Sequence, residues 1–382
     1  MRAAFVSTYP PRRCGITTFT RALSSAVGDR EIAVLTTSGD VRPYPREVRH
    51  HIRRDAPEEY LRVARELASC GADVVSIQHE YGIWGGTDGE FVLDFVHALE
   101  LPAVATLHTV LRMPTVGQRH IIAGLATAVE RFVVMSQVAA TLLRETYAVD
   151  PTRVEVIPHG VPDLRLVDPE TVKPSLGLAG RQVILSFGLL GPGKGYELAI
   201  DAMPAVVAAM PDACYVVLGA THPDLLRREG EAYRHGLVAR AHRLGLGEHV
   251  TFVDRYVGTV ELGTWLQAAD VFVTPYPNLD QIVSGTLSYA MGAGKAIVST
   301  PYTYARELLD DGRGVLVPPG SPSDLADAFT TLLGDPVLRA AMGAKAYRYG
   351  RAMVWPMVGS AYRRVFDTAV RNQSVAGISI PR

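Results

Sequence analysis

The chain has 382 residues, a formal net charge of −1 at pH 7, and a composition that is 48% hydrophobic and 20% charged. This length predicts two domains rather than one, and the near-neutral charge argues against general nucleic-acid binding. The three cysteines, Cys14, Cys70 and Cys214, form no CxxC pair, which favours a reducing cytoplasm over a disulfide framework or a zinc site. No signal peptide or transmembrane segment is apparent, so we expect a cytoplasmic protein.

Short apolar runs alternate with helix-length segments along the whole chain. In the first half the predicted strands are 3–7, 32–36, 74–78, 103–108, 132–135 and 154–158. In the second half they are 183–187, 213–218, 250–253, 271–274, 296–299 and 314–317. Strands separated by helices form parallel sheets with helices on both faces. The predicted fold class is therefore α/β, with two doubly wound, Rossmann-like domains that face a cleft.

Proline and charged residues mark the expected connection between these domains at 161–181. We place the N-terminal domain at 1–165 and the C-terminal domain at 166–350. The segment 351–382 is expected to be a helix that crosses back to the N-terminal domain, followed by a flexible tail after Asn372.

A glycine-rich turn, FGLLGPGKGYEL at 187–198, joins a predicted strand to a helix. Its glycines, Gly188 among them, let backbone N–H groups approach an anion, and Lys194 supplies a charge suited to phosphate. Only four of the 38 basic residues are lysines, so composition alone favours arginine at this position. An ordinary glycine-rich strand-to-helix turn is the alternative interpretation. Ser284, Gly285 and Thr286 open a later helix, whose N–H groups and dipole predict a second phosphate contact.

Polar residues also follow the strands of the first half. Gly15 lies in a turn that opens a helix and either binds an oxyanion or only caps that helix. His79, Glu80 and His108 follow two strands, where they would bind hydroxyls or transfer protons, or act only as structural hydrogen-bonding groups. The basic run 42–54 fits a solvated edge strand best, and peripheral contact with a membrane or an anionic acceptor is its alternative.

Several catalytic motifs are absent from the sequence. We find no Asp-x-Asp metal motif, no GxSxG elbow, no HExxH and no GxGxxG at dinucleotide spacing. We therefore expect no metal site and no cofactor apart from a co-substrate.

Motifs along nearly the whole chain resemble those of the family 4 glycosyltransferases, retaining enzymes of the GT-B fold. They are the turn at Gly15 and the segments 106–108, 156–161, 188–194, 268–273, 290–294 and 314–320. The strings QHEYGIWGG, TLHTVL, IPHGVPD and SGTLSYAMG resemble a bacterial subgroup. The resemblance implies retaining transfer from a nucleoside-diphosphate sugar to a small-molecule or glycan acceptor. It also implies that His108 contacts the donor sugar.

The family usually carries two glutamates with seven residues between them, and this chain does not. Gln281 and Tyr289 stand at those positions, a shift of one residue gives Asp280 and Ser288, and Leu189 replaces an arginine. These departures keep two alternatives open: a catalytically silent nucleotide-sugar-binding or partner protein, and a phosphate-using glycosyl transfer enzyme. The expected site residues are His108, Asp280 and Gln281 in catalysis; Gly15, Gly188, Lys194, Ser284, Gly285, Thr286 and Tyr289 in donor binding; and His79 and Glu80 on the acceptor side. The base, sugar, linkage and oligomeric state stay open.

Overall fold

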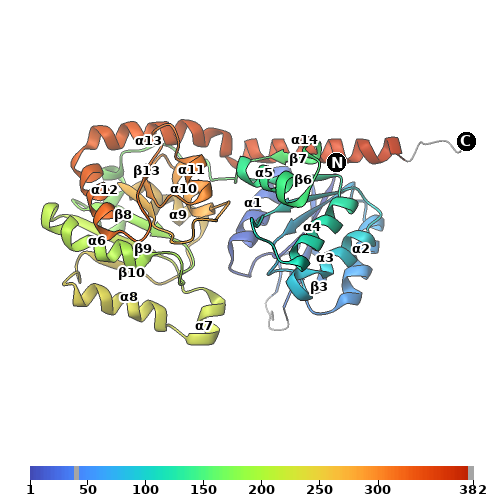
Figure 1. Cartoon of the computed structure of the whole chain (residues 1–382), viewed down its shortest axis with the longest axis horizontal. Helices are drawn as coiled ribbons and strands as arrows, with labels where there is room; N and C mark the ends of the chain where they lie inside the picture. The colour runs from blue at the N-terminus through green and yellow to red at the C-terminus, as the bar shows by residue number, and fades with distance from the viewer. Residues whose placement is uncertain (38–42, 377–382) are drawn as a thin grey trace, which may run out of the picture. The chain divides into compact units, whose positions relative to one another are not determined.

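The computed structural model describes residues 1–37 and 43–376. The chain forms two compact units (Figure 1): unit 1 contains Met1–Gly160 and Trp355–Arg382, and unit 2 contains Val161–Val354. Each unit is built around one parallel β-sheet. The predicted α/β class with two doubly wound, Rossmann-like parallel sheets is thus confirmed.

Unit 1 has a seven-stranded sheet in the order β3-β2-β1-β4-β5-β6-β7. Its strands are β1 (Ala3–Ser7), β2 (Arg30–Thr36), β3 (Val48–Arg53), β4 (Val74–His79), β5 (Ala103–Leu107), β6 (Arg131–Val134) and β7 (Val154–Val156). Its helices are α1 (Gly15–Val27), α2 (Pro57–Ser69), α3 (Phe91–His97), α4 (Val116–Ala128), α5 (Gln137–Tyr147) and α14 (Trp355–Ala376), with 3-10 turns η1 (Thr87–Gly89) and η2 (Pro151–Arg153). Strands β1, β4 and β5 are buried along their whole length, as expected where helices cover both faces.

Unit 2 has a six-stranded sheet in the order β10-β9-β8-β11-β12-β13. Its strands are β8 (Gln182–Phe187), β9 (Ala213–Leu218), β10 (Val250–Val253), β11 (Val271–Thr274), β12 (Ala296–Ser299) and β13 (Val315–Leu316). Its helices are α6 (Tyr196–Ala209), α7 (Pro223–Glu229), α8 (Ala232–Arg243), α9 (Thr259–Ala268), α10 (Gly285–Gly292), α11 (Thr303–Leu308), α12 (Pro322–Gly334) and α13 (Pro336–Gly350), with 3-10 turns η3 (Pro169–Thr171), η4 (Lys173–Leu176) and η5 (Arg351–Met353). Two apolar clusters hold its helices against the sheet.

Helix α14, drawn in red in Figure 1, belongs to unit 1 although it is the last element of the chain. It packs against α1 and also reaches β4 and β5. The ring of Phe366 lies 6.2 Å from that of Phe5 in β1, and the side chain of Tyr362 is fully buried. The first unit therefore draws part of its core from the far end of the sequence.

The segment 161–181, which its composition marked as a connection, is an integral part of unit 2. Val161 forms a parallel bridge with Val354, and its N–H donates to the carbonyl of Met353 at 2.8 Å. Lys173 is 1% exposed, and its Nζ lies 2.7 Å from Asp270 Oδ2. The prolines here shape short 3-10 turns on a folded unit rather than a free linker.

Two sequence expectations touch residues outside the described part. The basic run 42–54 contains β3, which is an edge strand as expected, whereas Arg42 lies outside the described residues. Helix α14 continues past Asn372 to Ala376, and the expected tail at 377–382 lies outside the described residues.

Candidate functional site

The glycine loop of unit 2 follows β8 and leads into α6. Gly188, Gly193 and Gly195 have φ values of 137°, 85° and 70°, which side chains other than glycine rarely adopt. A Cβ added to Gly219, which follows β9, would lie 1.9 Å from the carbonyl oxygen of Gly188. Two backbone segments therefore meet in direct contact at the carboxyl ends of β8 and β9.

The ammonium of Lys194 is held at this loop by an aromatic ring. Its Nζ lies 4.3 Å from the ring centroid of Tyr276, two residues beyond the end of β11. Such a cation–π contact attracts the ammonium group to the ring face and limits its motion. The Tyr276 hydroxyl is 2.9 Å from Thr286 Oγ1, so the same residue connects the glycine loop to the start of α10.

Helix α10 begins at Gly285, with Ser284 as its N-cap. Ser284 Oγ accepts a hydrogen bond from the N–H of Leu287 at 3.3 Å. The first N–H groups of any helix have no acceptor inside the helix, and its dipole adds partial positive charge there. A Cβ on Gly188 would lie 3.5 Å from Thr286 Cγ2. The structure therefore brings Gly188, Lys194 and the α10 N-terminus together as an arrangement suited to a phosphate.

The loop before α10 carries the two residues expected to replace the family glutamates. Asp280 is exposed, and its backbone N–H donates to Asn278 Oδ1 at 3.0 Å. Gln281 donates from Nε2 to the carbonyl of Val283 at 2.8 Å. Tyr289 is only 6% exposed and packs against Phe187, with ring centroids 6.1 Å apart, so its ring belongs to the apolar core.

In unit 1, His108 follows β5 directly. Its Nε2 lies 2.9 Å from Gln78 Oε1, and its ring meets the ring of Phe19 edge-on at 4.9 Å. Burial lowers the pKa of His108 to about 3, and the nearby His159 and His79 add to this effect. An imidazole with so low a pKa is a weak base, so His108 acts as a neutral hydrogen-bonding group at physiological pH.

Glu80 is an ionisable residue that follows β4, just as His108 follows the neighbouring strand β5. Its carboxylate accepts hydrogen bonds from the hydroxyl of Thr109 and from the backbone N–H groups of Tyr81 and Gly82. Burial raises the pKa of Glu80, while these hydrogen bonds oppose the shift. Glu80 and Thr109 thus lie side by side after the neighbouring strands β4 and β5. The Glu80 carboxylate accepts hydrogen bonds and the Thr109 hydroxyl can donate or accept, which suits a hydroxyl ligand.

His79, expected beside Glu80 on the acceptor side, lies in a different environment. Side chains alternate along a strand, so His79 points to the face opposite that of Gln78, whose amide oxygen lies beside His108 Nε2. It is fully buried, and burial lowers its pKa to about 4. Among the described side chains, neither ring nitrogen of His79 has a hydrogen-bond partner.

Gly15 is the first residue of α1. The Sγ of Cys14, the N-cap, accepts from the N–H of Thr17 at 3.4 Å. Gly15 is exposed, and a Cβ added to it would meet nothing within 4 Å. The capping interaction is therefore present, and oxyanion binding by the same turn stays a prediction.

Two family models match the chain. The model described as "Glycosyltransferase Family 4" matches residues 12–164, and the one described as "Glycosyl transferases group 1" matches residues 181–335. The chain belongs to the family 4 glycosyltransferases.

Relatives and solved structures agree with this assignment. A D-inositol 3-phosphate glycosyltransferase from Segniliparus rotundus is 27% identical over 82% of this chain and 71% of its own length. A GDP-mannose-dependent monoacylated alpha-(1-6)-phosphatidylinositol monomannoside mannosyltransferase from Corynebacterium glutamicum is 24% identical over 95% of this chain and 97% of its own. Anabaena Alr3699/HepE, solved in complex with UDP-glucose, superposes with a TM-score of 0.77 at 15% identity, over 96% of this chain and 99% of its own. The glycosyltransferase thus has the GT-B fold.

No helix in the described part of the glycosyltransferase is long and apolar enough to cross a bilayer.

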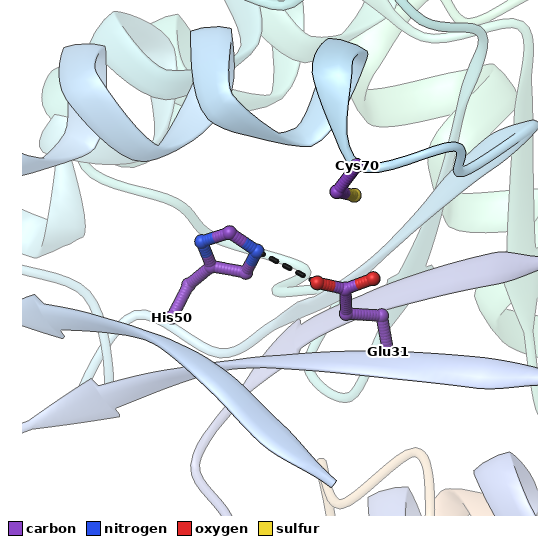
Figure 2. A group of neighbouring side chains, drawn as sticks. All are labelled: Glu31, His50 and Cys70. Carbon is purple, nitrogen blue, oxygen red and sulfur yellow. Dashed lines mark hydrogen bonds and ion pairs between the residues drawn. The ribbon is translucent and has the colours of Figure 1, made fainter.

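A separate polar cluster lies in unit 1, where β2, β3 and the end of α2 meet. Figure 2 shows the ring of His50 directed at the carboxylate of Glu31, with Cys70 beside them. His50 bridges Glu31 at 2.8 Å and Glu66 at 3.1 Å, and Arg2 pairs with Glu31 at 2.7 Å. Zinc binds thiolate, whereas the thiol of Cys70 donates to a backbone carbonyl and burial raises its pKa. We therefore assign this cluster to the packing of the sheet edge as an ion-pair network.

Three residues of these two sites escaped the sequence analysis: Tyr276, Phe19 and Gln78. Tyr276 follows the end of a strand, which is the one sequence signal that could have selected it. Gln78 is the penultimate residue of β4, and Phe19 lies inside α1. The sequence around them therefore predicts only an ordinary strand residue and an ordinary helix residue. Their roles depend on contacts between elements far apart in sequence.

Proposed function

We propose that this glycosyltransferase moves a sugar from a nucleoside-diphosphate sugar to a hydroxyl group of a small-molecule or glycan acceptor, with retention of anomeric configuration. The observation that carries the proposal is Lys194 held over Tyr276 beside the glycine loop and the N-terminus of α10. Departure of a diphosphate requires stabilisation of its negative charge. The lysine and the oriented N–H groups would supply this stabilisation without a metal ion.

The residues of unit 1 suit the sugar and the acceptor. Its low pKa makes His108 a weak base, so it would hydrogen-bond a hydroxyl of the donor sugar rather than remove a proton. Glu80 and Thr109 would bind the acceptor hydroxyl. Retention follows the family pattern, in which the leaving phosphate helps to deprotonate an acceptor that attacks from the same face.

The names of the relatives suggest the first substrates to test. UDP-glucose is bound in HepE, and the Corynebacterium glutamicum relative is named as GDP-mannose-dependent. D-inositol 3-phosphate appears in the name of the Segniliparus rotundus relative. We propose uridine or guanosine diphosphate sugars as donors and a cyclitol phosphate or cyclitol lipid as the first acceptor class.

One observation favours a catalytically silent nucleotide-sugar-binding protein as the second candidate. Tyr289, which replaces one family glutamate, is buried in the core, and the Nε2 of Gln281, which replaces the other, is bonded within its own loop. Asp280 is then the remaining carboxylate near this position. Transfer or donor hydrolysis would support the enzyme, whereas tight donor binding without either would support the silent protein.

Calorimetry with UDP, GDP and their sugars tests the donor site. A charge-assisted hydrogen bond contributes about 1.5–3 kcal/mol, so Lys194→Ala should weaken nucleoside-diphosphate affinity by about 10- to 150-fold. Lys345→Ala is the matched control, because Lys345 is an exposed lysine of the same unit that donates to the carbonyl of Asp311. Equal affinity in Lys194→Ala and in the control would refute the proposed donor site.

A further inference from the structure

A chain of buried hydrogen bonds links the last helix to His108 in unit 1. The hydroxyl of Tyr362 in α14 lies 3.1 Å from Thr106 Oγ1 in β5. Gln78 Nε2, in the neighbouring strand β4, donates to Thr106 Oγ1 at 3.5 Å and to Ser76 Oγ at 3.1 Å. Gln78 Oε1 then lies 2.9 Å from His108 Nε2.

The members of this chain are held in place by the sheet and by burial. Gln78 and Thr106 are directly paired in the parallel register of β4 and β5. The side chains of Gln78, Ser76, Thr106 and Tyr362 are all fully buried. A buried amide is stable only when both of its ends find partners, and here one end meets two hydroxyl oxygens while the other meets the imidazole.

The amide oxygen determines where His108 carries its proton. A carboxamide oxygen only accepts hydrogen bonds, so His108 Nε2 must be the protonated nitrogen of a neutral ring. We propose that Gln78 is a positioning residue that fixes His108 as the Nε2–H tautomer, so that Nδ1 accepts a hydrogen bond from a donor-sugar hydroxyl, and that Tyr362 holds Gln78 through Thr106. The sugar ligand in this inference rests on the proposed function, whereas the tautomer does not.

Glutamine at position 78 carries no charge, so it does not stabilise a protonated His108. The titratable groups that act on this ring are His79 and His159, both of which disfavour its protonation, as does burial. Phe19 contributes only an aromatic edge. A carboxylate at position 78 would instead stabilise the imidazolium form, and a protonated Nδ1 would donate a hydrogen bond rather than accept one.

The first test is Gln78→Glu, followed by NMR titration of His108 without any substrate. A carboxylate at this distance raises a histidine pKa by about 1–3 units. We expect this upward shift in the variant, together with a loss of transfer activity below pH 6 that the wild type does not show. An unchanged titration of His108 in folded Gln78→Glu protein would overturn the inference.

Tyr362→Phe tests the chain without placing a charge in the core. It removes one buried neutral hydrogen bond, for which the free-energy scale of about 0.5–1.5 kcal/mol predicts a loss of about 2- to 13-fold in kcat/KM. The NMR signal of an Nδ1–H form of His108 should also become detectable. The control is Tyr60→Phe, which loses a buried hydroxyl that donates to the carbonyl of Arg54 at 2.9 Å and accepts from the N–H of Gly85 at 3.0 Å. The control should leave the His108 tautomer unchanged.

A double mutant separates positioning from simple destabilisation. In a Gln78→Met background the connection is already broken, so Tyr362→Phe should have no further effect on kcat/KM or on the His108 tautomer. Independent, additive effects would overturn the inference. If the tautomer responds as expected but no transfer is found with any donor, the proposed function fails and the positioning role stands. If transfer is found and the tautomer does not respond, the positioning role alone fails.

Discussion

Substitution of His79 by phenylalanine should make the free energy of unfolding less sensitive to acid. Burial lowers the pKa of His79 to about 4, whereas a histidine in an unfolded chain titrates near 6.5. The unfolded state therefore binds more protons between these values, and stability falls as the pH drops from about 6.5 toward 4. At pH 5, His79 therefore lowers the free energy of unfolding by roughly 2 kcal/mol relative to pH 8, since each unit of pKa difference is 1.36 kcal/mol.

Urea unfolding at pH 8, 6.5, 5.5 and 5 measures this contribution in wild type, His79→Phe and a control. The control is His120→Gln, at an exposed position of α4. His108 and His159 remain in every protein, so the difference between wild type and variant reports His79 together with its effect on the pKa of His108. We expect His79→Phe to retain roughly 2 kcal/mol more of its pH 8 stability at pH 5 than wild type does.

The variant should also fold well at pH 8. The ring nitrogens of His79 lack partners among the described side chains, and an aromatic ring of similar shape keeps the edge-on contact with Tyr81 at 5.0 Å. Equal loss of stability on acidification in wild type and His79→Phe would refute the buried, neutral assignment. A raised KM for the acceptor in His79→Phe would instead restore the role in acceptor binding.

Two further predictions concern the glycine loop and its aromatic partner. Gly219→Ala should destabilise unit 2 and weaken nucleoside-diphosphate binding, because its Cβ would overlap the carbonyl of Gly188 at 1.9 Å. A Cβ on Gly191 would have no protein contact under 3.9 Å, so Gly191→Ala should match wild type in thermal unfolding. Tyr276→Leu removes the ring under Lys194 and should weaken UDP or GDP affinity by about 2- to 30-fold. Tyr276→Phe keeps the ring and loses only the hydroxyl bonded to Thr286. An equal loss of affinity in both variants would show that nucleotide binding depends on the hydroxyl and not on the ring.

The strands were predictable because each is a short apolar run between helical segments. Four of the six in unit 2, 213–218, 250–253, 271–274 and 296–299, match the structure residue for residue. The last, predicted at 314–317, shortens to Val315–Leu316. Edge strands pair on one side only, so their ends depend on neighbours that the local sequence does not reveal.

The candidate site was predictable only where backbone chemistry is local. The glycine loop and the Ser284 cap follow from residue types at neighbouring positions, which the structure brings together through Tyr276. Gln78 could not be selected, because its link to His108 arises from the register of two strands 28 residues apart. Gln281 and Asp280 were chosen by resemblance, and their proposed role in sugar recognition stays a prediction.

The return of α14 to unit 1 has a consequence for biosynthesis. Unit 2 is inserted in sequence between the first 160 residues and the helix that completes their core. A ribosome therefore releases Met1–Gly160 with the α1 face open and must translate more than 200 further residues before Tyr362 and Phe366 emerge. Unit 2 can fold as a continuous segment during this interval, whereas unit 1 is completed only after α14 has emerged. The N-terminal sheet is thus the part of the nascent chain that most needs protection from aggregation.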